Sequence, residues 1–385
     1  MKRNVTIGFD ARYIATPREE MASYTRLVID ALSESAPRYT YLRAYTPGRV
    51  SSSLAESVAQ RHNIELMEPD GSFWRRWQRL WQEWGIAADL KRGDVELYHG
   101  LAGSLPLGLA ARNIRSVVTL HNLDFLHDNN ITALPERSIR SIYTGWILRQ
   151  SDRVVAVSDC VKREVSEVFN IDPDKIDVVY PGVDRRYTLP IDDAVSQSVA
   201  ERYQLPEQYL LSVGAQWERR NFINVIRALP LLDSDIHYLI VGHATPHTPR
   251  LKRVARELGV ANRVHFIHDY DDADLAVIYR RARLYLFPSS YEGFATTVAE
   301  AMASCTPVVV GSGSSMHEVA GSAATYVTPD SREEMLDALR TLLADDDLCR
   351  DMVRRGLFHV SRFRPEVVAY NLTSCYRRLD VDIKG

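Results

Sequence analysis

Short runs of apolar residues recur along the chain, and amphipathic stretches lie between most of them. A run of four to eight apolar residues bounded by turn residues is typical of a strand buried on both faces. Strands that alternate with helices indicate an α/β fold with mostly parallel sheets. The expected strands are 5–9, 39–45, 64–67, 95–99, 117–120 and 154–157 in the first half, and 209–213, 238–242, 264–267, 284–287, 308–310 and 323–327 in the second.

Helical periodicity follows the first strand and dominates the last third of the chain. We expect helices at about 22–33, 331–344, 347–360 and 365–379. A chain of 385 residues is too long for one ordinary core, which favours two domains. The turn Pro181-Gly182-Val183-Asp184 opens a polar stretch to Asp193 that we interpret as the linker. The predicted domains are 1–187 and 188–362.

An aromatic segment, FWRRWQRLWQEW at 73–84, lies between two expected strands. Read as one helix, it places its four tryptophans on a single face and its arginines off that face. A basic aromatic helix of this kind is typical of contact with a membrane surface. Packing of the tryptophans on the sheet or on the other domain is an equally good interpretation, since four indoles are much apolar surface to leave in water. The tryptophans are Trp74, Trp77, Trp81 and Trp84.

Composition narrows the class of protein. Apolar residues make up 45% and charged residues 25% of the chain, as in globular proteins. A net charge of -3 argues against a nucleic-acid binder. Four cysteines without a C-x-x-C pair predict neither zinc nor disulfides and fit a reducing compartment. Since 1–14 lacks the pattern of a signal peptide and no spanning apolar run occurs, we expect a cytoplasmic protein.

The segment 284–310, LYLFPSSYEGFATTVAEAMASCTPVVV, contains the densest set of candidate functional residues in the chain. It predicts a strand, a loop, a helix capped by Thr296 or Thr297, and a second strand. The loop should lie at the carboxyl edge of a parallel sheet, where free amides at the helix start favour an anion such as phosphate. Glu300 would then accept hydrogen bonds from ribose hydroxyls. Taken alone, Glu292 and Glu300 are better interpreted as a solvated loop acid and a favourable charge in the first turn of the helix.

Two further loops are placed at such an edge. His121 directly follows the strand 117–120, where a histidine is either a site residue or a structural hydrogen-bonding group. After the strand 209–213, Arg219 and Arg220 are adjacent in a strand-to-helix loop. Their two planar guanidiniums suit a diphosphate, and the alternative is a solvated basic turn. Asp272 and Asp274 precede a helical pattern, so we expect no metal site there.

The run EGFATTVAEAMASCTPVV resembles the E-x7-E region of the family-four retaining glycosyltransferases, which usually reads EGFGLPVLEAMA-GTPVV. The resemblance extends over nearly the whole chain. It implies the GT-B fold, in which two doubly wound domains face each other and a nucleotide sugar lies between them. It also implies that the final helix, 363–385, packs back on the first domain.

The resemblance assigns roles residue by residue. Catalytic roles fall on His121, Arg219, Arg220 and Glu292, and donor-binding roles fall on Ala22, Gly214, Tyr270, Gly293, Phe294, Ala295, Thr296, Thr297 and Glu300. The chain departs from the family pattern at three places. Arg220 replaces a lysine, His268-Asp269-Tyr270 replaces Gly-x-Val, and Glu20-Met21-Ala22 replaces a Gly-x-Gly loop. Side chains at both glycine positions restrict close approach of the backbone to the donor.

The implied reaction is transfer of a sugar from its nucleoside diphosphate to an acceptor hydroxyl, with retention at the anomeric carbon and with neither metal nor cofactor. The first-domain pattern looks most like bacterial mannosyltransferases of surface polysaccharides, which favours GDP-mannose as donor and a glycan or lipid-linked acceptor. A peripheral place on the inner face of the plasma membrane would fit such an acceptor. Two alternatives stay open, a GT-B epimerase or phosphorylase and a nucleotide-sugar-binding subunit without activity.

Overall fold

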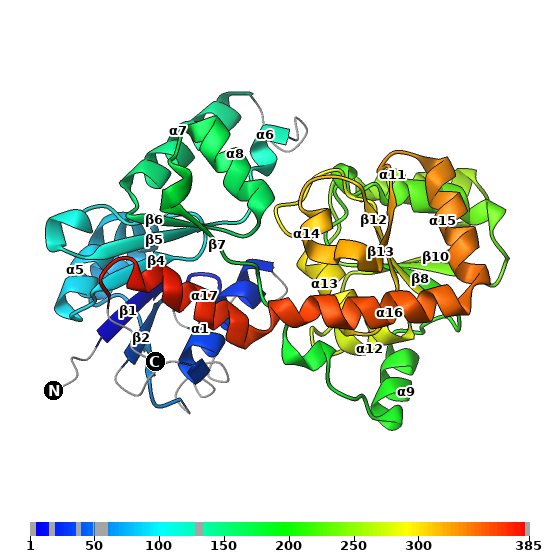
Figure 1. Cartoon of the computed structure of the whole chain (residues 1–385), viewed down its shortest axis with the longest axis horizontal. Helices are drawn as coiled ribbons and strands as arrows, with labels where there is room; N and C mark the ends of the chain where they lie inside the picture. The colour runs from blue at the N-terminus through cyan, green and yellow to red at the C-terminus, as the bar shows by residue number, and fades with distance from the viewer. Residues whose placement is uncertain are drawn as a thin grey trace. The chain divides into compact units, whose positions relative to one another are not determined.

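The computed structural model describes residues 5–14, 20–35, 40–48, 50, 61–127 and 134–381. It divides into two compact units, one of residues 1–182 with 365–385 and the other of residues 183–364. Each unit is built on one parallel sheet with helices on both of its faces (Figure 1). The predicted fold class, two doubly wound α/β domains, is therefore confirmed.

The sheet of the first unit has the strand order β3-β2-β1-β4-β5-β6-β7, and every pairing is parallel. Its strands are β1 (Val5–Asp10), β2 (Thr40–Tyr45), β3 (Ile64–Met67), β4 (Leu97–Gly100), β5 (Arg115–Leu120), β6 (Arg153–Ala156) and β7 (Ile176–Val178). Its helices are α1 (Glu20–Ser35), α3 (Ser72–Arg76), α4 (Gln78–Leu80), α5 (Ile86–Arg92), α6 (Asp124–His127), α7 (Leu134–Gln150), α8 (Asp159–Phe169) and α17 (Pro365–Arg377).

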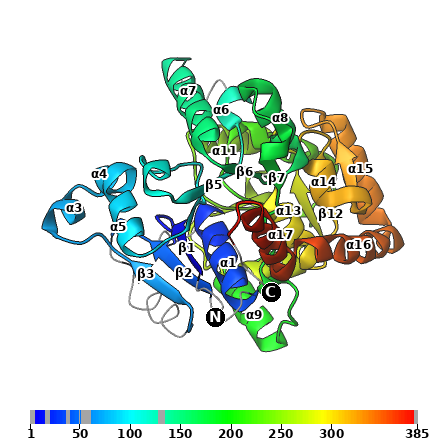
Figure 2. The same cartoon turned by 60° about the vertical axis from the view of Figure 1, so that its left-hand side comes forward.

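The last helix, α17, joins the first unit although it follows the second in sequence. It lies beside α1 in both ribbon views (Figure 2). Leu372 and Tyr376 of α17 enter the same core as Val28 and Leu32 of α1. Tyr376 also hydrogen-bonds His99 of β4, 2.7 Å from Oη to Nδ1. Burial of these apolar side chains is what holds the chain's end on the first unit.

The sheet of the second unit has the order β10-β9-β8-β11-β12-β13 and is also wholly parallel. Its strands are β8 (Tyr209–Val213), β9 (His237–Val241), β10 (Val264–Ile267), β11 (Leu284–Phe287), β12 (Val308–Gly311) and β13 (Ala324–Val327). Its helices are α9 (Asp193–Arg202), α10 (Phe222–Ala228), α11 (Thr248–Glu257), α12 (Leu275–Arg281), α13 (Thr296–Ala303), α14 (Met316–Ala320), α15 (Arg332–Ala344) and α16 (Asp346–Val360).

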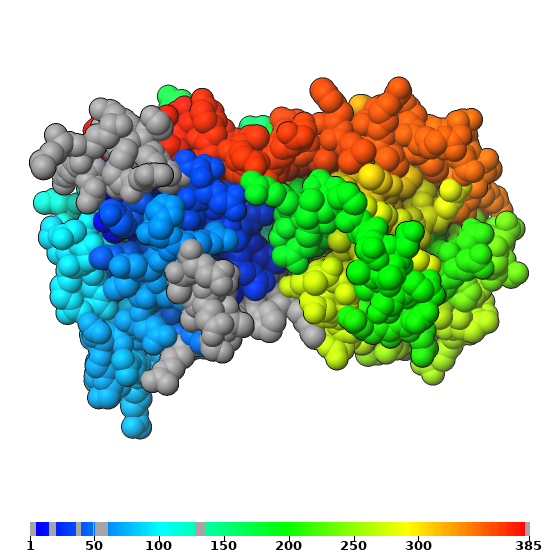
Figure 3. Space-filling view, turned by 90° about the horizontal axis from the view of Figure 1, so that it is seen from below, coloured from blue at the N-terminus to red at the C-terminus, as the bar shows by residue number. Residues whose placement is uncertain are grey.

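The expectation of one helix over 73–84 is wrong. Helix α3 stops at Trp77, whose φ of -111° and ψ of 55° are not helical. A π-helical turn at Trp81–Gly85 then adds residues to the following turn. Because of the break and the wide turn, the four tryptophans do not lie on one helix face. Figure 3 shows the light-blue segment that follows β3 as a projection from the first unit.

The four tryptophans are therefore divided between core and surface. Trp81 is 1% exposed, and its Nε1 donates to Asp89 Oδ2 at 2.7 Å. Trp74 is half-buried against Gly85. Trp77 and Trp84 are 51% and 63% exposed. The packing interpretation thus holds for Trp81, which lies in the core, while Trp77 and Trp84 face water.

Candidate functional site

The predicted strand-loop-helix unit is present at the carboxyl edge of the second sheet. Strand β11 is fully buried and ends at Phe287, and α13 begins at Thr296. The predicted capping role of the threonines is wrong, because Thr296 and Thr297 lie within the first turn of α13 and no side chain caps the helix. The first amides of α13 are instead bonded to the backbone, Thr296 N–H to the Phe294 carbonyl at 3.1 Å and Val298 N–H to the Ala295 carbonyl at 3.0 Å.

Glu292 is the centre of a buried polar cluster in this loop. Its side chain is nearly inaccessible, and its Oε1 accepts hydrogen bonds from Arg219 Nη1 at 2.9 Å and from Ser289 Oγ at 3.0 Å. Arg220 Nε lies 3.3 Å from the same oxygen. Two guanidiniums against one carboxylate leave these three side chains with an excess positive charge. An excess of that sign, held in a largely desolvated loop, favours an anionic ligand.

The backbone of Glu292 is held by a loop that follows β12. Its N–H donates to Ser314 Oγ, and its carbonyl accepts from Ser315 Oγ, both at 3.0 Å. Sequence reasoning missed both serines. The Gly-Ser-Gly-Ser-Ser run at 311–315 directly follows a strand that pairs with β11, and small polar residues at such a point indicate a loop near the site.

The two arginines are positioned by the loop that follows β8. They close a short 3-10 turn, and the N–H of Ser290 donates to the Arg219 carbonyl at 2.9 Å. The Arg220 guanidinium lies over the Phe287 ring, 5.2 Å from its centroid, and packs across Gly214. Gly214 has a φ of +128°, and a Cβ there would lie 1.5 Å from Arg220 Nη1. A glycine is required at this position for both reasons.

Glu300 lies within α13, apart from the Glu292 cluster. Its Oε2 accepts a hydrogen bond of 3.0 Å from the hydroxyl of Tyr279. Burial and then the negative charge of Glu300 raise the pKa of Tyr279 well above its ordinary value. Tyr187, whose pKa burial and Glu300 raise in the same way, packs edge-on against Tyr279. Glu300 is thus a carboxylate bordered by tyrosines, a partner that sequence reasoning did not foresee.

The other predicted donor-binding residues of the second unit follow strands β8, β10 and β11. Phe294 packs edge-on against Phe363, with 5.2 Å between ring centroids, and Ala295 precedes the first helical residue of α13. Gly293 adjoins Glu292 in the same loop. Tyr270 follows β10 and is buried. The structure therefore brings the residues at 214, 219–220 and 292–300 together at one sheet edge.

His121 and Ala22 belong to the first unit. His121 follows β5, as predicted, and its Nε2 lies 2.7 Å from the Leu101 carbonyl, to which it donates. The Tyr24 ring packs edge-on on the imidazole at 4.5 Å. These contacts fix the tautomer and orientation of the ring. Ala22 is fully buried within the first turns of α1, which begins two residues earlier than expected.

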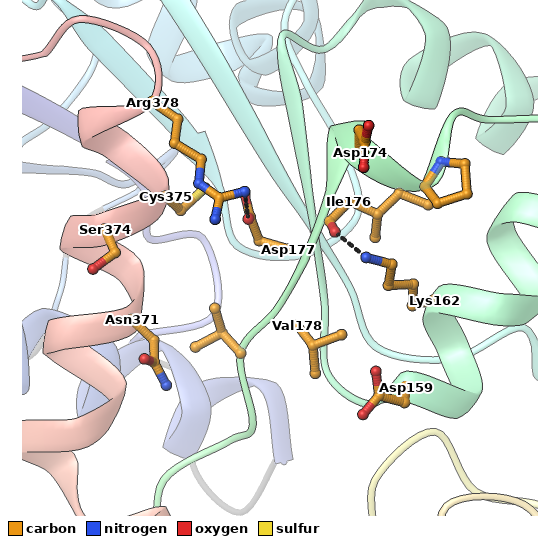
Figure 4. Close-up of a pocket in the computed structure, with 12 residues that line it drawn as sticks. Asp159, Lys162, Asp174, Ile176, Asp177, Val178, Asn371, Ser374, Cys375 and Arg378 are labelled. Carbon is orange, nitrogen blue, oxygen red and sulfur yellow. Dashed lines mark hydrogen bonds and ion pairs between the residues drawn. The ribbon is translucent and has the colours of Figure 1, made fainter.

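A separate pocket of about 390 Å³ lies between α8, β7 and α17 of the first unit (Figure 4). Three of its charged side chains are engaged with one another or with the backbone. Lys162 Nζ donates to the Ile176 carbonyl at 2.8 Å, and Arg378 pairs with Asp177 at 3.0 Å. None of the predicted site residues lines this pocket.

Among the residues that the structure describes, no three His, Cys, Asp or Glu side chains gather as metal ligands would. Within the same ranges, every helix is too short or too polar to cross a bilayer.

Two family models match the chain in succession. Residues 28–187 match the Glycosyltransferase Family 4 model, and residues 197–357 match the model of Glycosyl transferases group 1. Together they include most of the two units and nearly all the residues discussed above.

Curated relatives carry out glycosyl transfer. The O-antigen chain mannosyltransferase RfbU of Salmonella typhimurium is 28% identical over 256 residues, which are 64% of this chain and 68% of that protein. The O-antigen chain mannosyltransferase B of Escherichia coli is 26% identical over 74% of each chain. A D-inositol 3-phosphate glycosyltransferase of Segniliparus rotundus is 32% identical over 63% of this chain and 56% of its own.

Solved structures share the fold over almost the full length. Sucrose-phosphate synthase from Thermosynechococcus elongatus has a TM-score of 0.77 at 19% identity, with 98% of this chain and 99% of that chain covered. Anabaena HepE in complex with UDP and glucose has a TM-score of 0.73 at 15% identity, over 97% and 100% of the chains. The lipopolysaccharide glycosyltransferase WaaG has a TM-score of 0.70 at 16% identity, over 99% and 100%.

Proposed function

Because this chain belongs to the GT-B glycosyltransferases that join a family 4 domain to a group 1 domain, we propose that it transfers mannose from GDP-mannose to an acceptor hydroxyl. The acceptor is a glycan or a lipid-linked glycan of bacterial surface polysaccharide synthesis. The Arg219, Arg220 and Glu292 cluster carries this proposal, because it concentrates positive charge in a largely buried loop. The relatives named as O-antigen mannosyltransferases support the choice of mannose.

Four residues of the site have roles in the proposed reaction. Arg219 and Arg220 bind the diphosphate and stabilise the charge that develops on it as the sugar leaves. Glu300 accepts hydrogen bonds from the ribose, and His121 faces the donor sugar. As the bond from the anomeric carbon to the diphosphate breaks, the acceptor oxygen bonds to that carbon from the same face and gives its proton to the leaving phosphate oxygen, so the sugar is transferred with retention. The guanidiniums supply the positive charge that a metal supplies in other transferases, so the proposed reaction is independent of metal and of cofactors.

UDP-glucose is a second candidate donor, because HepE, a structural neighbour, is described in complex with UDP and glucose. A screen of nucleotide sugars by thermal shift separates the candidates, since a bound donor stabilises the folded protein by mass action. GDP-mannose should raise the melting temperature more than UDP-glucose. Transfer to a soluble glycan should follow, with a product of unchanged anomeric configuration by NMR and with full activity in EDTA.

Three outcomes would contradict parts of this proposal. Donor binding without transfer or hydrolysis would indicate a binding subunit. Conversion of the sugar without an acceptor would indicate an epimerase. Loss of activity in EDTA, restored by a divalent cation, would contradict metal independence.

We also propose that the protein works as a peripheral enzyme on the cytoplasmic face of the plasma membrane. The contact is an aromatic patch that consists of Phe73, Trp77, Leu80 and Trp84, each 46% or more exposed. Indole rings prefer the bilayer interface, and the arginines at 75, 76 and 79 surround them with positive charge. The tryptophans of the buried side, Trp74 and Trp81, serve to hold this segment on the first unit.

A further inference from the structure

The pocket between α8, β7 and α17 is a cavity that the proposed reaction does not use. Its volume of about 390 Å³ lies within the range of small-molecule sites. Figure 4 shows α8 on one side of β7 and α17 on the other, with polar side chains from both helices around the strand. All three elements belong to the first unit, so the pocket is complete within that unit.

Strand β7 lines the pocket and is the edge strand of its sheet. The N–H of Val179 donates to the Ala156 carbonyl of β6 at 3.0 Å. Because alternate residues of a parallel strand bond to the same neighbour, Asp177 and Val179 face β6. Ile176 and Val178 turn their backbone groups away from β6. The outer edge of β7 therefore presents the N–H and the carbonyl of Val178 on the side of the pocket.

A lysine closes this edge to a peptide strand. Lys162 of α8 donates from Nζ to the Ile176 carbonyl at 2.8 Å, and so occupies an outward acceptor of β7. Addition of a strand depends on a run of outward backbone hydrogen bonds. A lysine at an edge strand is one of the means by which proteins prevent such pairing. The pocket thus favours a compact ligand over an extended peptide.

The charges of the lining nearly cancel. Its carboxylates are Asp159, Asp174 and Asp177, and its cations are Lys162 and Arg378. Arg378 pairs with Asp177 at 3.0 Å, so each of these two charges is compensated locally. A phosphate or a metal cation would meet about as much repulsion as attraction in such a lining. An uncharged ligand that makes hydrogen bonds fits it better.

Hydrogen-bond donors and acceptors are mixed around the cavity. Asn371 of α17 offers an amide that both donates and accepts, and Ser374 offers a hydroxyl oxygen. Val178 adds a backbone donor and a backbone acceptor. A hydroxyl group also donates and accepts, so a ligand with several hydroxyls can satisfy this lining. Val178 and Pro173 supply apolar surface, on which the C–H face of a sugar ring can pack.

One end of the pocket reaches the sheet edge at which His121 lies. Asp159 follows β6 and His121 follows β5, and these two strands are parallel neighbours. The carboxyl ends of neighbouring strands lie about 5 Å apart. A ligand that extends from the pocket past Asp159 therefore approaches the histidine that we assign to the donor sugar.

We propose that this pocket binds a neutral saccharide, namely the sugar units of the acceptor glycan that lie next to the reacting one. This inference rests on the proposed glycosyl transfer and assigns a site to the part of the acceptor that does not react. Asn371, Ser374 and the outer edge of Val178 hydrogen-bond to its hydroxyls. Binding of these remote units holds the reacting hydroxyl in position for transfer.

Titration of the full chain with disaccharides tests the pocket without any transfer. Mannobiose, maltose and lactose are the probes, and saturation-transfer NMR detects their binding. At least one probe should bind the wild type in excess GDP and UDP, which keep it from the donor site. Asn371→Leu should weaken that binding about tenfold, or about 1.4 kcal/mol, because the amide is lost. Tyr370→Leu is the matched control, since Tyr370 is 68% exposed on the same helix and does not line the pocket.

Steady-state kinetics separate this inference from the proposed function. Asn371→Leu should raise the KM for a glycan acceptor about tenfold and leave the KM for the nucleotide sugar unchanged. If no probe binds, or if both variants bind the probe equally well, the pocket inference is wrong even where transfer is observed. If a probe binds the wild type and binds Asn371→Leu weakly while no sugar is transferred, the pocket is a saccharide site and the proposed function is wrong. Should Asn371→Leu fail to fold, Asp174→Ala, at an exposed position of the lining, replaces it.

Discussion

Arg219 Nη1 lies 2.9 Å from Glu292 Oε1. The arginine that we propose to bind the diphosphate is therefore already paired with an acid of the same site. The side chains are 12% and 8% exposed, and a pair that is so poorly solvated is strongly coupled. A bound diphosphate would have to share or replace the Glu292 carboxylate. Glu292 therefore both positions the arginines and competes with the donor for them.

Glu292→Gln should separate these two effects. The variant keeps an oxygen acceptor but removes the competing charge, so free nucleoside diphosphate should bind several-fold more tightly. The unliganded variant should melt at a lower temperature, because two buried guanidiniums lose their counterion. Calorimetric titration with the diphosphate measures the first effect, and thermal melting with and without it measures the second. Weaker diphosphate binding in a folded variant would show that Glu292 does not compete.

Gly214→Ala should displace the Arg220 guanidinium. A methyl group there would overlap Nη1 of that side chain, and a φ of +128° is costly for any residue with a Cβ. Affinity for the nucleoside diphosphate should fall by tenfold or more. Gly259→Ala is the matched control, since Gly259 also has a positive φ but no atom within 4 Å of the added Cβ. Equal losses of diphosphate affinity in both variants would mean that backbone strain alone is responsible.

Glu300→Ala should weaken donor binding by about 1 to 3 kcal/mol, the cost of a lost hydrogen bond to a charged group. Tyr279→Phe is the accompanying control. It removes the hydroxyl that donates to Glu300 but keeps the carboxylate and the ring, so its effect on donor affinity should be smaller. Isothermal titration with the nucleotide sugar measures both. An unchanged affinity in Glu300→Ala would remove the ribose role from this residue.

The buried strands and the site loop could be predicted from the sequence, because both are local patterns. Strands such as Leu284–Phe287 are apolar at every position, since helices cover both faces of a parallel sheet. The E-x7-E spacing likewise lies within one loop and one helix. The partners of those acids are long-range. Ser314, Ser315 and Tyr279 reach them from other elements, and only tertiary packing decides which hydroxyl meets which carboxylate.

The tryptophan segment shows where periodicity misleads. Spacings of three and four residues predict one face only if the helix is continuous. The break at Trp77 and the π-helical turn at Trp81 change the direction in which the later tryptophans point from the helix axis. Neither irregularity is marked by a proline in the sequence. Gly85 permits Trp81 and Trp74 to pack closely, so the fold gains a buried indole at the expense of a regular helix.

His99 should make the protein less stable in acid. Burial, and then the charge of His121, lowers the pKa of His99 to about 3, from about 6.5 in an unfolded chain. Between these values the unfolded chain binds more protons, so stability rises with pH across this range. The stability that the lowered pKa of His99 contributes is fully present above pH 6.5. It is lost as the pH falls toward 3, by up to about 1.4 kcal/mol per pH unit.

A His99→Gln variant tests this dependence. The hydroxyls of Tyr376 and Thr119 hydrogen-bond to the His99 ring nitrogens at 2.7 and 2.8 Å, and a glutamine can hydrogen-bond to hydroxyls without titrating. Urea unfolding at a series of pH values should show a shallower decline in the variant than in the wild type. Parallel declines would mean that other groups dominate the acid response.

The first helix provides a test of where the donor is held. The family's Gly-x-Gly loop aligns with Glu20-Met21-Ala22, yet α1 already begins at Glu20 and Ala22 is fully buried in its first turns. The residues that we assign to the diphosphate and the ribose, by contrast, all belong to the second unit. We therefore expect Glu20→Gly with Ala22→Gly to leave the donor affinity unchanged or to tighten it. Unfolding free energy should fall by about 1 to 2 kcal/mol, because glycine is a poor helix former. If the folded variant instead loses donor affinity by tenfold or more, about 1.4 kcal/mol, then this turn makes productive contacts with the donor and its alignment with the glycine loop is wrong.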